Sequence, residues 1–171
     1  MTAPATEAVA FTVLVAALLG AAVSDIRQYL IPNRYPVAIA LAYLVYATGH
    51  PLDQGLWGLA AGFAAFVSCA LLFAAGIFGG GDAKLLSATM LWAGPSLAAT
   101  FLLYTVLAGG ALAIAWLSPF RRLMPAAPQA SPSASPGAPA SGMRSRLHQP
   151  TPYGAAIAAG GLYVAALRAL N

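Results

Sequence analysis

Residues 55–78 read GLWGLAAGFAAFVSCALLFAAGIF, an apolar segment of 24 residues without a single charged side chain. The hydrocarbon core of a bilayer is about 30 Å thick, and a helix needs about 20 apolar residues to cross it. The segment is long enough to cross, and it has no charged face to turn toward water. It therefore predicts a helix that spans a membrane.

The rest of the chain has the same composition. Of its 171 residues, 60% are apolar and only 7% are charged, whereas a soluble domain carries about 25% charged residues. So few charges cannot cover a surface that faces water, so most of the surface must face lipid. Most of the eight basic residues lie in the gaps between apolar segments, which argues against a nucleic-acid-binding face.

Five further segments complete the predicted architecture, which is an all-α, polytopic integral membrane bundle of about six transmembrane helices. A polar stretch at 25–34 separates the first two helices, and Gly94-Pro95 ends the fourth. The six predicted helices cover residues 8–24, 35–48, 55–78, about 82–94, about 96–117 and 153–170. We expect residues 1–171 to form a single domain.

Residues 119–150 are rich in Pro, Ala and Ser and poor in large apolar side chains. Such a composition cannot bury a core, so it predicts a flexible loop. If the N-terminus lies outside, this loop, residues 25–34 and residues 79–84 all face the cytoplasm. Seven of the eight basic residues then lie on the cytoplasmic side, and only Arg168 lies outside, as the positive-inside rule requires.

The chain has only four acidic residues, and two of them are candidates for catalysis. Glu7 and Asp53 lie at the predicted outer ends of helices, whereas Asp25 and Asp82 both lie at the predicted cytoplasmic boundary. An ionisable group near hydrocarbon is costly and marks a functional candidate. Two carboxyl groups brought together can share one proton, activate a water and protonate a departing amine. This chemistry is that of an aspartic peptidase.

A structural role for the same aspartates is an open alternative. Asp25 is followed by Arg27 and Asp82 by Lys84, so each aspartate could form a charge pair. Asp82 could also cap the N-terminus of the fourth helix. A single cysteine, Cys69, excludes an intramolecular disulfide and a zinc site built from cysteines, and we expect neither metal nor cofactor.

Three glycines, Gly79, Gly80 and Gly81, directly precede Asp82. Glycine adopts backbone conformations that other residues avoid, and it allows another chain to approach closely. A peptidase must hold an extended substrate backbone beside its catalytic carboxylate, and a glycine run suits this purpose. The run could equally form a tight turn.

Two elements of the sequence resemble the type IV prepilin peptidase family, which consists of GxGD-type aspartic peptidases of the membrane. The first is Asp25 followed by Ile31-Pro32-Asn33, and the second is GGGDAKL at residues 79–85. Residues 152–157, PYGAAI, resemble the last helix of the family's short branch, which is associated with tight-adherence (Flp-type) pili. The resemblance covers residues 8–118 and 152–170.

The resemblance implies that Asp25 and Asp82 are the catalytic pair of an endopeptidase in the bacterial inner membrane. It implies cleavage of prepilin or pseudopilin leaders at the cytoplasmic face, in contact with lipid and other pilus-assembly proteins. Lys84 would orient substrate or support the site, and Pro32 and Asn33 would shape the loop that presents Asp25. Long members carry a domain with paired Cys-x-x-Cys motifs and also methylate the new N-terminus; this chain lacks that domain, so we expect no methyltransferase activity.

The main alternative is a non-enzymatic membrane scaffold or a small proton-coupled transporter. A transporter favours charges at the midplane between repeated halves. No internal repeat is apparent, and both aspartates are predicted at one membrane face.

Overall fold

The computed structural model describes residues 4–117 and 153–170, and every regular element in these ranges is a helix. The predicted all-α class is therefore confirmed. The predicted loop at 119–150 lies outside the described residues. The helices are α1 Pro4–Gln28, α2 Arg34–Ala47, α3 Leu52–Ala74, α4 Gly80–Leu117 and α5 Tyr153–Leu170.

Four of these helices, α1, α3, α4 and α5, are long and apolar enough to cross a membrane. The helix α2 is apolar but has only 14 residues. The predicted count of six spans is therefore not confirmed, although the membrane-protein class is. The difference arises from the short α2 and from α4, which contains two of the predicted segments.

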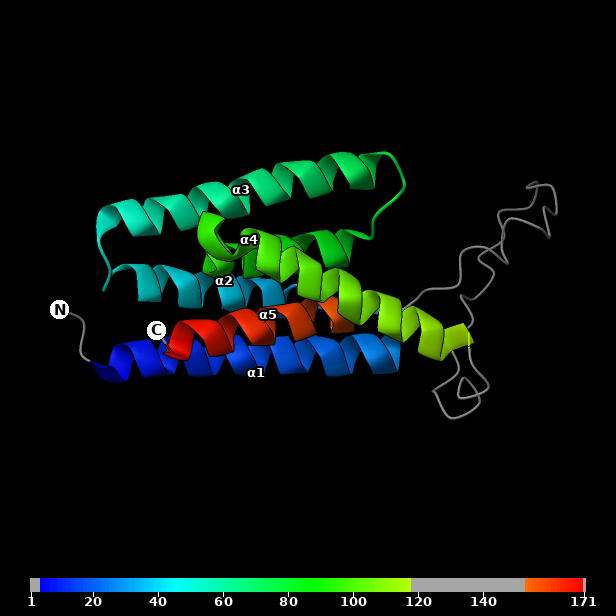
Figure 1. Ribbon diagram of the computed structural model, residues 1–171, viewed down its shortest axis with the longest axis horizontal. Helices are drawn as coiled ribbons and strands as arrows, with labels where there is room; N and C mark the ends of the chain where they lie inside the picture. Colours follow the sequence, from blue (N-terminus) through cyan, green and yellow to red (C-terminus); the bar gives the residue numbers. More distant parts are fainter. Residues whose placement is uncertain (1–3, 118–152, 171) are drawn as a thin grey trace.

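The long helix α4 is interrupted at Gly94, where φ is 59° and ψ is −176°. These angles are accessible essentially to glycine alone, and the following Pro95 cannot donate a backbone hydrogen bond. Figure 1 shows the chain doubling back at this point, so α4 consists of two arms, residues 80–93 and residues 95–117. The interruption predicted at Gly94-Pro95 is confirmed.

Two predicted helix boundaries were wrong. Residues 25–28 were expected to break the first helix, but α1 continues through Gln28. A charged sequence does not prevent helical hydrogen bonding when its side chains lie at a helix end, where polar partners are accessible. Likewise α3 begins at Leu52, three residues before the predicted start of the third helix at residue 55. The last helix, Tyr153–Leu170, has the predicted bounds.

The helix α5 packs against both α1 and α4 (Figure 1). Its buried face is made largely of small residues, which let neighbouring helices approach closely in lipid. A Cβ at Gly161 would lie within 3.1 Å of the Leu18 side chain, and one at Gly160 would overlap the Thr105 hydroxyl. These contacts fix the middle of α5 against α1 and α4.

The bundle has two chemically different ends. The end of α1 and the beginnings of α2, α4 and α5 meet at one end, which we call the aspartate end. It carries Arg27, Arg34 and Lys84, whereas Arg168 lies at the opposite end beside Gly94. In the described part of the chain, three of the four basic residues therefore lie at the aspartate end.

Candidate active site

The end of α1 shapes the loop that follows Asp25. Tyr29 adopts a left-handed conformation with φ of 52°, and its N–H donates to the Asp25 carbonyl at 2.8 Å. The Ser24 hydroxyl donates to the carbonyl of Leu30 at 2.8 Å. These bonds close the helix and turn the chain back across it. Ile31 is thereby brought over the end of α1 and becomes buried.

Ile31 connects the three segments that form the site. A Cβ at Gly81 would lie 3.3 Å from the Ile31 Cβ, so the start of α4 packs directly on this side chain. A Cβ at Gly154 would overlap the Ile31 Cδ1, so the start of α5 packs on it as well. Glycine at both positions therefore allows α4 and α5 to converge beside Asp25.

Asp25 is 5% exposed, and its side chain is bound to the last helix. The Ala155 N–H donates to the Asp25 Oδ2 at 3.1 Å. The first N–H groups of a helix have no partner within the helix, and a carboxylate there also interacts favourably with the helix dipole. Asp25 thus occupies the position of a capping acceptor for α5, a contact that the sequence reasoning missed.

Asp82 lies in the first turn of α4 and is partly buried. It is not the N-cap, as the structural alternative supposed, because α4 begins at Gly80 and the Ala83 N–H already donates to the Gly79 carbonyl at 2.9 Å. A Cβ at Gly79 would lie 2.8 Å from the Asp82 Oδ2. The carboxylate therefore extends back over the glycine run.

Asp25 and Asp82 both lie at the aspartate end. Ile31 and the Asp25 carboxylate both border Gly154, and Gly81, the residue before Asp82, packs on Ile31. The expected charge pairs with Arg27 and Lys84 do not form. Within residues 4–117 and 153–170, no lysine or arginine nitrogen makes an ion pair with either carboxylate. The two acids thus lie in one site, and no lysine or arginine of the described chain forms an ion pair with them.

Lys84 instead connects α4 to the start of α2. Its Nζ donates to the Asn33 Oδ1 at 3.0 Å. Asn33 precedes α2 but makes no capping bond with its side chain, and the carbonyl of Pro32 accepts the Tyr35 N–H at 3.2 Å. Pro32 and Asn33 therefore end the loop that follows α1.

The three glycines before Asp82 have different surroundings. Gly79 lies under the Asp82 carboxylate and Gly81 lies against Ile31, while a Cβ at Gly80 would lie 3.3 Å from the Phe73 ring. None of the three has a positive φ. All three glycines lie close to neighbouring side chains, which is one of the two reasons for glycine given from the sequence. The other reason, an unusual backbone conformation, was wrong.

The sequence does not indicate that Gly154 and Ala155 lie beside Asp25. The PYGAAI segment at 152–157 resembles the last helix of the family's short branch, but nothing in the sequence connects it to a residue 130 positions earlier. A glycine at the start of an apolar helix was the available signal. Its purpose becomes visible only when Ile31 and the Asp25 carboxylate occupy the space where its side chain would stand.

An apolar helical bundle with two acidic side chains near one end defines a class of membrane protein with an acidic site at the end of its helices. The sequence model of the type IV leader peptidase family matches residues 12–114, more than half of the chain. The chain belongs to the type IV leader peptidase family. No curated protein and no solved structure matches it.

Family membership indicates a hydrolase of the leader peptidase type that works in a membrane on a prepilin-type substrate. The matched region covers most of α1, all of α2 and α3 and most of α4, so it contains both aspartates. It ends before α5, which supplies the amide donor to Asp25.

Proposed function

We propose that this protein is an aspartic endopeptidase whose catalytic pair is Asp25 and Asp82. One carboxylate would act as the base that activates a water, and the other, protonated, would donate to the substrate carbonyl and then to the departing nitrogen. The convergence of two acids from separate helices, with no cation paired to them in the described chain, carries this proposal.

The proposed substrate is a prepilin-like protein of the Flp type. Its leader would lie at the cytoplasmic face of the bacterial inner membrane, where the positive-inside rule places the aspartate end. The single Cys69 excludes the paired cysteine motifs of the long family members, and we propose cleavage without N-methylation and without a metal.

A groove lined by Asn33 and Lys84, but by neither aspartate, suits the apolar segment of such a substrate. It has a volume of about 450 Å³, and α2, α3 and the first arm of α4 form its walls. Asn33 and Lys84 lie at its polar end, whereas Val37, Phe66 and Leu91 provide apolar lining farther along. Side chains from one face of a substrate helix would enter it while the leader reaches the two acids.

A purely structural role for Asp25 competes with this proposal, because Asp25 accepts the Ala155 amide. The variant Asp25→Asn separates the two roles, since an amide oxygen still accepts that bond but cannot act as a base. The protein and a candidate prepilin would be co-expressed, and cleavage would be read as a mobility shift. We expect Asp25→Asn and Asp82→Asn each to abolish cleavage while membrane insertion is retained.

Asp53→Asn is the matched control, because Asp53 is an exposed carboxylate in the first turn of α3, at the opposite end of the bundle. It should leave cleavage unchanged. Full cleavage by Asp25→Asn would show that this residue only anchors α5. Full cleavage by Asp82→Asn would refute the catalytic pair.

A further inference from the structure

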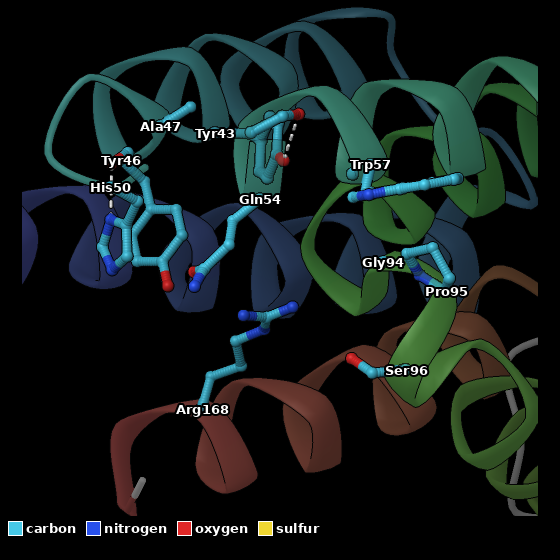
Figure 2. A pocket seen from close by; sticks show the side chains of 12 residues that line it. Tyr43, Tyr46, Ala47, His50, Gln54, Trp57, Gly94, Pro95, Ser96 and Arg168 are labelled. Atoms are coloured by element: carbon cyan, nitrogen blue, oxygen red, sulfur yellow. Dashed lines mark hydrogen bonds between the residues drawn. The ribbon is translucent and has the colours of Figure 1, made fainter. Parts of the chain in front are cut away.

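A pocket of about 550 Å³ lies at the end of the bundle opposite the two aspartates. Residues of α2, α3 and α5 and the break in α4 surround it (Figure 2). The proposed peptidase chemistry makes no use of this pocket. Its lining combines aromatic rings with one arginine, so the ligand that it fits is amphipathic and negatively charged.

Arg168 is held in place at the wall of the pocket. Its Nε donates to the Trp92 carbonyl at 2.9 Å, and its Nη2 donates to the Ala93 carbonyl at 3.3 Å. These are the last carbonyls of the first arm of α4, so the guanidinium caps a helix end. A guanidinium has five N–H groups, and these two bonds leave other N–H groups for a ligand.

The charge of Arg168 has no acidic partner in the described part of the chain. The ion pair found there joins Glu7 to His50, at 3.9 Å, and does not include the arginine. The arginine is also partly buried. A partly buried, fixed cation without a counter-ion is a strong attractor for an anion, and an arginine suits a phosphate because two of its N–H groups can bind two oxygens.

Three further hydrogen-bonding side chains surround the same space. Figure 2 shows Tyr46, Gln54 and Ser96 around the arginine head, each from a different element. Within residues 4–117 and 153–170, none of the three side chains makes a hydrogen bond to another protein group. A phenol, an amide and an alcohol can each donate to a phosphate oxygen.

The position and the apolar lining point to a lipid as the carrier of that phosphate. Trp57 is 63% exposed and forms part of the wall. Tryptophan and tyrosine are enriched at the level of lipid headgroups at both membrane surfaces, and a guanidinium can bind two oxygens of a headgroup phosphate. We propose that this pocket binds the headgroup of an anionic phospholipid, with Arg168 as counter-charge and Tyr46, Gln54 and Ser96 as hydrogen-bond donors.

The test uses the full-length protein in a neutral detergent, with lipid binding followed by native mass spectrometry. Three probes are compared: phosphatidylglycerol, phosphatidylcholine and inorganic phosphate. We expect saturable binding of phosphatidylglycerol, with phosphatidylcholine and phosphate each at least tenfold weaker. Equal binding of the two lipids, or binding of phosphate alone, would overturn the proposal.

Two variants assign the binding to this pocket. Arg168→Gln should weaken phosphatidylglycerol binding by about tenfold or more, since it removes a charged donor. Because this arginine also caps a helix, a double variant, Tyr46→Phe with Ser96→Ala, leaves the cap intact and should weaken binding several-fold. Ser68→Ala, a change on the exposed part of α3, is the control and should have no effect. Unchanged binding in the double variant would refute the assignment, whatever the behaviour of Arg168→Gln.

Discussion

The backbone amide of Ala155 donates a hydrogen bond of 3.1 Å to the carboxylate of Asp25, 130 positions earlier in the chain. A residue that we propose for catalysis therefore also holds the first turn of the last helix. The bond needs only an acceptor oxygen at position 25, whereas catalysis needs an ionisable group. Asparagine and alanine at position 25 should consequently have different effects on stability.

Asp25→Ala is expected to lower the free energy of unfolding by about 1–2 kcal/mol relative to Asp25→Asn, because it leaves the Ala155 amide without a partner. Thermal unfolding of both purified variants in the same detergent measures the difference. Hydrogen exchange at the Ala155 amide provides a local readout and should be faster in the alanine variant. Identical unfolding and exchange would mean that the bond contributes nothing to the fold.

Gly154→Ala should impair both the fold and the active site. Its methyl group would overlap the Ile31 Cδ1 and lie 2.9 Å from the Asp25 Oδ2. We expect destabilisation by about 1–3 kcal/mol and loss of most cleavage. Gly110→Ala is the control, since nothing lies within 4 Å of that position.

The combination of Gly154→Ala with Ile31→Ala tests this explanation. Removing the isoleucine side chain should restore part of the stability, while cleavage stays low because the new methyl group still crowds the carboxylate. Complete recovery of cleavage in this double variant would contradict the steric argument at Asp25.

Gly94→Ala is expected to destabilise the protein by about 1–3 kcal/mol, because φ at this position is 59° and a side chain there is strained. The new Cβ would also lie 3.3 Å from the Nη2 of Arg168. Gly55→Ala is a fair comparison, since its Cβ would make an ordinary contact with Ala47. Equal unfolding temperatures for the two variants would show that the break does not need glycine.

Lys84→Met should remove the bond to Asn33 and lower stability by about 0.5–1 kcal/mol, as expected for an exposed hydrogen bond. If the lysine acts only through this bond, Asn33→Ala should have the same effect, and the double variant should be no worse than either single one. A larger loss of cleavage in Lys84→Met than in Asn33→Ala would indicate a direct role in binding substrate.

Val37→Trp tests the groove beside the proposed site. Val37 is 53% exposed and lines the groove, so an indole there should fill space needed by the substrate helix. We expect a several-fold rise in KM with little change in kcat. Leu19→Trp places the same ring on an exposed position of α1, outside the groove, and should leave KM unchanged.

The sequence was sufficient to predict the features that depend on local composition. Charge-free segments such as 55–78 predict membrane helices, and the Gly94-Pro95 pair predicts the interruption inside α4, because both effects act over a few neighbouring residues. The last helix was predicted with its observed bounds for the same reason. The charged stretch 25–28 led to a wrong end for the first helix, because composition alone does not reveal which partners a polar side chain finds at a helix end.

The contacts between distant segments could not be predicted. That Ile31 packs on Gly81 and Gly154, and that Lys84 binds Asn33 and not Asp82, depends on how four helices pack together. Pairing two of four acidic residues was possible, because the topology assigned them to one membrane face. The residues that surround the two aspartates could not be predicted, because small residues such as glycine give no indication of what they will contact.

The last helix completes the surroundings of Asp25 although it lies outside the region that defines the family. Amino-acid differences in the first turn of α5 should consequently be treated as differences at the proposed active site, even though the region that defines the family does not include them. A homologue recognised through its first four helices alone should not be assumed to be a working enzyme until its final helix has been inspected for a small residue opposite the first aspartate.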